Sequence, residues 1–306
     1  MVSSFAMDLF DSMKPITIMA QVLALMNFNF DPLNGFTCSG ALKCYWIVMF
    51  GWKIVSVLLT LFKISQDSFQ WDLESFAHIL DSFLYSFGAV FIGSMFVAIN
   101  IKRLIKALTL INQEFFISHE TEAQKIYRFN IIVVIIQNLR FIVILIFFIA
   151  SRWKKQMNQH GAFKGFIYQI VRLSIEYCHI GLIAHYIAFV YAIYEMFGLL
   201  AKQVKKVNRV KCVVEGERAH NIVMDFVEEF NYSNGVMVYM VVISIFGEIV
   251  AHTPFIYKYR SVTYWTDVNW VILNACELFT LIALPQLTMF QVSLFVIIFK
   301  IWLLGM

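Results

Sequence analysis

Long apolar runs separated by short polar intervals dominate the hydrophobic pattern of this chain. Six runs are long enough to cross a hydrocarbon core of about 30 Å as helices, at residues 41–63, 76–101, 129–150, 166–200, 235–257 and 268–290. The chain then stays apolar to Met306, but this tail is only about half a span and is not expected to cross alone. The pattern predicts an all-α, multi-pass transmembrane helix bundle with six spans and an apolar C-terminal tail.

The composition supports a membrane protein and argues against a water-soluble one. The chain is 60% hydrophobic and 14% charged, with a mean hydropathy of +0.72, whereas soluble domains carry about 25% charged residues. The net charge is +4, but the basic residues form separate clusters, which indicates membrane topology and no nucleic-acid partner. Five scattered cysteines indicate no disulfide framework, and the N-terminus lacks the pattern of a cleavable signal peptide.

The polar interval 201–231 is the longest between spans. Its second half repeats apolar residues at helical steps, namely Ala219, Ile222, Val223, Phe226 and Phe230. A second face at the same steps is polar, namely Glu217, Asn221, Asp225 and Glu228. We expect a basic turn and then an amphipathic helix that enters the fifth span, although a plain solvated connection fits the pattern equally well. The fourth run would make about 50 Å of helix and must tilt or project from the bilayer.

Charge bias predicts the orientation of the bundle. Residues 1–40 form an amphipathic segment broken by Pro15 and Pro32, which is too short and too polar to span and precedes the transmembrane domain 41–306. With a cytoplasmic N-terminus, the inner segments hold thirteen basic residues and the outer segments seven, as the positive-inside rule favours. The basic loop after the third span is the exception. The sequon at Asn231 would then face the cytosol and stay unmodified.

The sequence contains no catalytic constellation, so we expect neither an enzyme nor a cofactor. It lacks a phosphate-binding loop, a dinucleotide fingerprint and a zinc-protease motif. Two Glu-x-x-His pairs, Glu176–His179 and Glu217–His220, have a spacing suited to a two-metal site. The predicted topology separates them across the membrane, so we expect no metal.

Ionisable residues inside spans are costly and are therefore candidates for function. Arg172 and Glu176 can pair on one helix, whereas Arg140 and Glu248 have no partner nearby in the sequence and fit a wet pocket in the outer half of the bilayer. The full set of candidate ligand-binding residues is Asp81, Tyr85, Phe87, Arg140, Tyr168, Arg172, Glu176, Tyr239 and Glu248. Lys53 and Lys300 have stems long enough to extend toward the membrane surface.

Four segments, in this order, resemble the insect gustatory receptor family. DLFDSMKPITIMAQVLAL is similar to that family's N-terminal helix, and KRLIKALTLINQEF to its first cytoplasmic connection. ERAHNIVMDFVEEFNYSNGVMVYMVVISIF resembles its fifth helix, and NACELFTLIALP its sixth, with Cys276 and Glu277 as the Cys-Glu pair. The family's Thr-Tyr and Gln-Phe signature of a seventh, pore-lining helix is absent, so a truncated chain or a replacement by the tail is expected.

The resemblance implies a ligand-gated cation channel at the plasma membrane. It implies a tetramer with like or other receptor subunits, an intracellular N-terminus, and a pocket for a small-molecule tastant among helices two to six, in the outer half of the membrane. The alternatives are an odorant receptor of the same superfamily, a seven-helix receptor coupled to G proteins, and a secondary transporter that uses the buried Arg and Glu residues. Lipid is the surrounding partner in each case.

Overall fold

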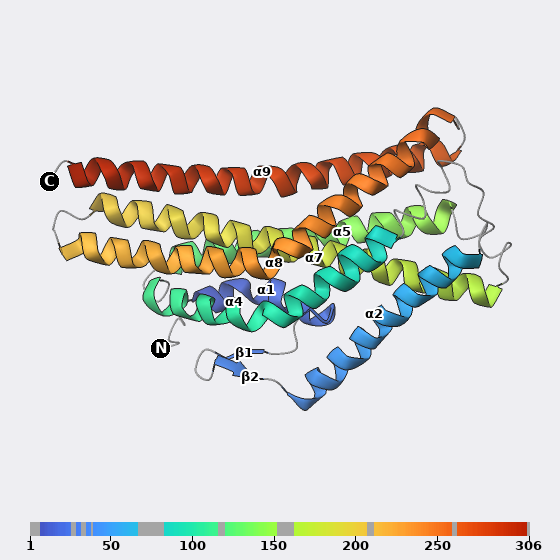
Figure 1. Ribbon diagram of the computed structural model, residues 1–306, viewed down its shortest axis with the longest axis horizontal. Helices are drawn as coiled ribbons and strands as arrows, with labels where there is room; N and C mark the ends of the chain where they lie inside the picture. The colour runs from blue at the N-terminus through green and yellow to red at the C-terminus, as the bar shows by residue number, and fades with distance from the viewer. Residues whose placement is uncertain are drawn as a thin grey trace, which may run out of the picture.

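The computed structural model of the chain is an elongated bundle of helices (Figure 1). It describes residues 7–25, 29–31, 35–37, 39–66, 83–115, 120–151, 162–206, 211–258 and 262–304. The elements are α1 (Leu9–Val22), β1 (Asn29–Asp31), β2 (Gly35–Thr37), α2 (Gly40–Gln66), η1 (Leu84–Gly93), α4 (Ser94–Phe115), α5 (Glu120–Ser151), α7 (Ala162–Lys206), α8 (Lys211–Lys258) and α9 (Val262–Leu304). β1 and β2 form a short antiparallel hairpin in which Phe30 lies opposite Phe36.

Five of the described helices are long and apolar enough to cross a membrane. The candidate spans are Gly40–Phe62, Glu120–Ile146, Gln169–Lys202, Glu217–Val250 and Val271–Leu294. The second predicted span, 76–101, differs: residues 84–93 are wound as the π-helix η1, and α4 follows from Ser94. The apolar stretch across this junction, Val90–Asn100, is shorter than a membrane span. Residues 76–82 lie outside the described part of the chain.

Apolar side chains cover the outside of the bundle. Val48 on α2, Ile146 on α5 and Phe279 on α9 are exposed by 67%, 60% and 71%. Water would penalise such a surface, whereas lipid tails match it. The long apolar helices and this apolar exterior together indicate a multi-pass protein embedded in a membrane.

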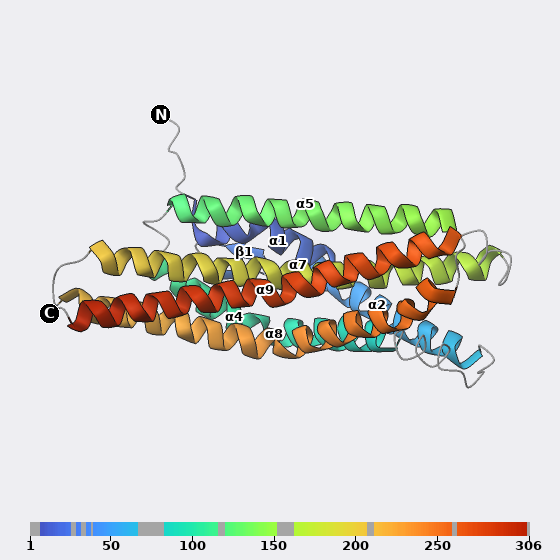
Figure 2. The same cartoon turned by 90° about the horizontal axis from the view of Figure 1, so that it is seen from above.

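Helix α7 is the centre of the bundle. In its most apolar 18-residue window 78% of the residues are buried, against 17–39% in the other four candidate spans. It packs against α1, α2, η1, α5, α8 and α9, and Figure 2 shows it between its neighbours. A helix surrounded on all sides needs apolar residues all round, which accounts for the unbroken apolar run of the sequence here.

The N-terminal helix α1 is packed inside the bundle. Asp8 caps it by accepting from the Asp11 amide at 2.8 Å. The Asn112 side chain on α4 accepts from the Leu9 amide at 2.9 Å and donates to Asp8 at 3.1 Å. Asn130 on α5 donates to a carbonyl of α1 at 2.9 Å. Three polar side chains therefore fix α1 between α4 and α5.

The other end of α1 is held by close packing. Leu23 lies against Gly181 of α7, where a Cβ atom would be 1.8 Å from a Leu23 methyl carbon. Only glycine leaves room for this approach. Ala24 follows with φ of 53°, a left-handed conformation that stops the helix.

Three helices are much longer than a bilayer is thick. α7, α8 and α9 have 45, 48 and 43 residues, which correspond to about 65–72 Å. At one end of the bundle, where α7 ends and α8 begins, these three helices extend past α4 and α5 (Figures 1 and 2). The apolar C-terminal tail is part of α9, which continues through Pro285 to Leu304.

The predicted amphipathic helix in the second half of the 201–231 interval is confirmed. α8 runs without interruption from Lys211 to Lys258. Val223, Phe226 and Phe230 of the apolar face are at most 2% exposed, and they pack in the core. The polar face is exposed, with Glu217, Asn221, Asp225 and Glu228 on the outside. Since Phe189 of α7 stacks on Phe226 and Phe230, this segment is packed against α7 and is not a plain solvated connection.

Candidate functional site

A set of polar side chains joins four helices around the middle of the bundle. One polar contact links each neighbouring pair of helices: α5 with α9, α9 with α8, α8 with α7, and α7 with α5. We call this set the polar ring, and its members are Asn138, Arg140, Tyr177, His179, Ser244, Glu248, Asn274 and Glu277.

The link between α5 and α9 is an ion pair. The Arg140 guanidinium Nη1 contacts the Glu277 carboxylate Oε1, and the two side chains are only 11% and 4% exposed. Such a pair is shielded from water, so its attraction is stronger than that of a surface pair. Losing one partner would leave a charge in a poorly solvated place.

The link between α9 and α8 is a hydrogen bond to a second carboxylate. The Asn274 amide donates to Glu248 Oε2 at 2.7 Å, and Glu248 is 3% exposed. Asn274 and Glu277 are three residues apart and therefore share one face of α9. One face of α9 thus makes polar contacts with both α8 and α5.

The ring is completed through α7. Ser244 Oγ of α8 lies 3.4 Å from His179 Nε2, and the direction of donation depends on the tautomer of the imidazole. Tyr177 donates its hydroxyl to Asn138 Oδ1 of α5 at 3.1 Å. Because Tyr177 and His179 are two residues apart, they face different neighbours of α7.

All members of the ring lie at a similar depth. Arg140 is 11 residues before the end of α5 at Ser151, and Glu248 is 10 residues before the end of α8 at Lys258. His179 is 17 residues after the start of α7. At 1.5 Å per residue these positions are about 15–26 Å from the helix ends. These helix ends lie at one end of the bundle, and α7 ends and α8 begins at the other (Figure 1).

Four predicted site residues lie in or beside this layer. Arg140 and Glu248 belong to the ring, and both have partners on α9 that their local sequence does not indicate. Arg172 and Glu176 form the expected pair on one helix, with Nε and Oε1 3.9 Å apart. Glu176 is 3% exposed, so its carboxylate is as buried as that of Glu248.

The other predicted residues are not gathered with them. Phe87 of η1 stacks on Phe83 and Phe91, and Tyr239 of α8 is 63% exposed on the outside of the bundle. Asp81 lies outside the described residues, and the positions of two further side chains, those of Tyr85 and Tyr168, are likewise not described.

Sequence reasoning predicted none of the four contacts in the ring, and only Arg140 and Glu248 of its eight residues were candidate ligand-binding residues. Asn274 was not singled out, and Glu277 was noted only as part of a family resemblance. A signal was present, because Asn274 and Glu277 are two polar residues three apart inside an apolar run. That spacing places both on one helix face, which an apolar span can hold only against polar partners.

The chemistry available to the ring is electrostatic. It holds two buried carboxylates, one guanidinium and one imidazole. No group of three or more His, Cys, Asp or Glu side chains that could hold a metal occurs among the described residues. The exposed Glu217 and the half-buried His220 lie on the stem part of α8. The ring can hold four helices in register, and its arrangement can change if a ligand or proton competes for its charges.

No known protein family matches this chain, and no curated protein matches it either. The function must therefore be inferred from geometry and charge. Two features support such an inference. One is the buried polar ring, and the other is the set of stems, which are the parts of α7, α8 and α9 that extend past the ends of α4 and α5.

Proposed function

We propose that this chain is a subunit of a ligand-gated cation channel of the insect gustatory receptor type, located in the plasma membrane and opened by small-molecule tastants. The observation that carries the proposal is the extension of α7, α8 and α9 at one end of the bundle. A subunit of this kind needs a helical stem outside the bilayer as well as a ligand-responsive bundle inside it. The proposal assigns these two roles to the stems and to the polar ring.

Basic residues are concentrated at the end with the stems. There α4 and α7 end, and α5 and α8 begin (Figure 1). Segments 102–128 and 202–218 contain eleven Lys and Arg residues. Because cytoplasmic segments are enriched in these residues, this distribution supports a cytoplasmic location of the stems and of the N-terminus.

The C-terminal part of α9 has a surface suited to another subunit. Leu287, Phe290, Leu294 and Ile297 follow each other at steps of three and four residues, and each is at least 36% exposed. Leu287, Phe290 and Leu294 lie in the last part of the candidate span Val271–Leu294, and Ile297 lies beyond its end. An apolar seam at this spacing is typical of helices that pack against other helices. It supports assembly into a homo- or hetero-oligomer, in our proposal a tetramer.

Small-molecule detection is assigned to the polar ring because ligand binding must change a contact between helices to open a channel. The Arg140–Glu277 and Asn274–Glu248 contacts join separate helices. A ligand that replaces either contact would favour another arrangement of α9. Arg140 and Glu248 are the side chains that we propose to meet the ligand.

Sidedness is tested by inserting one epitope tag into the 152–161 connection and a different tag into the 207–210 connection. In intact cells we expect staining of the first tag only, and after permeabilisation staining of both. The second tag thus serves as an internal control for cell integrity. Staining of the 207–210 tag in intact cells would contradict the proposal.

The natural sequon at Asn231 is a weaker test of sidedness. Asn231 is exposed, but it lies within α8 and Ser233 is 1% exposed. A helical sequon with a buried serine is a poor acceptor on either side of the membrane. Lack of sugar therefore carries no information, whereas sugar at Asn231 would contradict a cytoplasmic stem.

A secondary transporter is the second candidate, because buried charged groups at membrane depth are typical of transport pathways. Recording of tastant-evoked current in cells that express the chain separates the two. A channel passes current whose reversal potential follows the cation gradient only, whereas a coupled transporter shifts its reversal potential with the substrate gradient. Glu248→Gln should abolish the response in either case, so it is the reversal potential that decides.

A further inference from the structure

A cavity that meets the polar ring at Tyr177 lies between α2 and α7. The end of α1 and one residue of η1 complete its walls, and its volume is about 160 Å³. Its lining is mostly apolar, with Leu23, Met49, Val90 and Ile175 among the walls. The cavity includes none of the ligand-binding residues that the sequence suggested.

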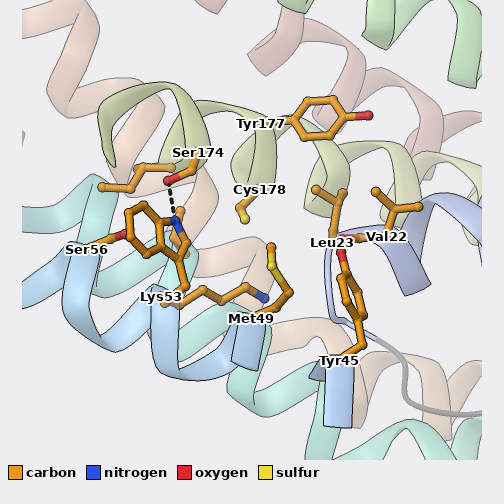
Figure 3. A pocket seen from close by; sticks show the side chains of 12 residues that line it. Val22, Leu23, Tyr45, Met49, Lys53, Ser56, Ser174, Tyr177 and Cys178 are labelled. Carbon is orange, nitrogen blue, oxygen red and sulfur yellow. Dashed lines mark hydrogen bonds between the residues drawn. The ribbon is translucent and has the colours of Figure 1, made fainter. Parts of the chain in front are cut away.

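Lys53 is buried beside this cavity. It is 3% exposed, although the length of its side chain had suggested that it would extend toward the membrane surface. Figure 3 shows its amine directed into the space between Met49, Cys178 and Tyr45. Its Nζ has no hydrogen-bond partner among the residues that the structure describes. A buried ammonium group without an acceptor is strongly disfavoured.

The other polar groups of the lining are mostly engaged. Trp52 donates its indole N–H to Ser174 Oγ at 3.1 Å (Figure 3), and Ser174 donates its hydroxyl to a backbone carbonyl at 2.8 Å. Tyr45 donates to the Val22 carbonyl. Ser56 lies three residues after Lys53, and its Oγ lacks a hydrogen-bond partner within the described part of the chain. The Lys53 ammonium is therefore the charged group left to donate toward the cavity, and Figure 3 shows the Ser56 hydroxyl on a different side.

The charge of the lining defines the ligand. No Asp or Glu is among the described residues that line the cavity, so Lys53 is its single charged group there. A cation is repelled by the ammonium, and a neutral apolar molecule leaves it without an acceptor. An anion with one carboxylate satisfies Lys53 and places its remaining carbons against the apolar walls.

We propose that this cavity binds a small monocarboxylic acid, with its carboxylate on Lys53. An apolar cavity of about 150 Å³ holds a molecule the size of benzene, which corresponds to an acid of about four to six carbons here. The end of α1 forms one wall through Val22 and Leu23. Binding therefore stabilises the contact of the N-terminal helix with α2 and α7. This inference concerns binding only and does not depend on the proposed channel.

The test measures equilibrium binding of radiolabelled butyrate to the whole purified chain in lipid nanodiscs, by dialysis at neutral pH. Butyramide is the neutral probe of the same shape. Lys53→Met removes the charge with little change in volume, and Lys43→Met is the matched control, because Lys43 is on the same helix but exposed. We expect Lys53→Met to bind butyrate roughly tenfold or more weakly, and Lys43→Met to bind it as the unchanged chain does.

The unchanged chain alone already decides the issue if Lys53→Met fails to fold. Butyrate must then bind more tightly than butyramide, by roughly tenfold or more. Equal affinity for the two probes would overturn the proposal, because the cavity would then select for shape only. Retention of full butyrate affinity in folded Lys53→Met would overturn it as well. The proposal would also be overturned if the chain bound no butyrate but formed an adduct with butanal at Lys53 that borohydride traps. Lys53 would then act as an amine nucleophile.

Discussion

Replacing Glu277 by glutamine tests whether the polar ring holds the bundle together. Glu277→Gln keeps the size and planarity of the side chain but removes its charge. Arg140 then lies 11% exposed beside a neutral amide. The matched control is Glu217→Gln, because Glu217 is an exposed glutamate on the stem of α8.

The expected loss of stability follows from the burial of the pair. Two unit charges about 4 Å apart attract by about 4 kcal/mol at an effective dielectric constant of about 20. Removal of one partner of a buried pair typically costs about 3–5 kcal/mol. Arg140 takes part in further interactions, which will offset part of this loss, so we expect about 3 kcal/mol for Glu277→Gln. For Glu217→Gln we expect a change within about 0.5 kcal/mol.

The assay is unfolding of the purified chain in mixed micelles with an increasing fraction of a denaturing detergent, followed by far-UV circular dichroism. A double-mutant cycle with Arg140→Met and Glu277→Met isolates the pair from its surroundings. We expect a coupling free energy of about 2 kcal/mol or more. A coupling below about 0.5 kcal/mol would refute the argument, because the two charges would then contribute independently.

Four further substitutions lie on α1 or at its contacts. Each is measured by the same unfolding assay, with a second measurement where one is named. Gly181→Ala places a methyl group against Leu23 and should lower the free energy of unfolding by about 1–3 kcal/mol. Adding Leu23→Ala to the same chain should restore part of this loss. If it does not, the loss has no steric cause. Ala24→Gly removes the cost of a left-handed alanine with φ of 53° and should stabilise by roughly 1 kcal/mol, so a loss would contradict the helix stop. Asn112→Ala removes two hydrogen bonds to the start of α1 and should lower the free energy of unfolding by about 1–3 kcal/mol. It should also make α1 more accessible to protease, and unchanged cleavage would contradict the role given to Asn112. Partial burial, with the neighbouring Asp8 carboxylate as a second cause, raises the pKa of Asp11, so its ionisation opposes folding. The folded protein thus loses stability as the pH rises through this pKa, and Asp11→Asn should reduce that loss, which a pH series measures.

Sequence periodicity was most informative for the stem of α8. The steps between Val223, Phe226 and Phe230 defined a helix face, and that face is buried against α7. Periodicity reports which residues share a face because helix geometry is local. The same locality explains the pairing of Arg172 with Glu176, whose spacing of four residues is enough to bring them together.

The composition of the apolar runs determined the class of the protein. The number and length of these runs indicated a helical membrane bundle, because only a bilayer accommodates so much apolar surface. The described structure has five candidate spans. The region of the second predicted span is divided between η1 and α4, and hydropathy alone does not distinguish a π-helical stretch from an α-helix.

Only the tertiary structure showed which residues meet across helices. Arg140 and Glu277 are separated by 137 residues, and Trp52 and Ser174 by 122. Such contacts depend on the rotation and depth of each helix, which are set by packing against neighbours, as between Gly181 and Leu23. The burial of Lys53 has the same origin: its sequence position allows it to reach the surface, but α1, α2 and α7 enclose it. The chain alone thus determined what kind of helices form and which of their faces are apolar, while the packing of those helices decided which buried polar groups find partners and which face a cavity.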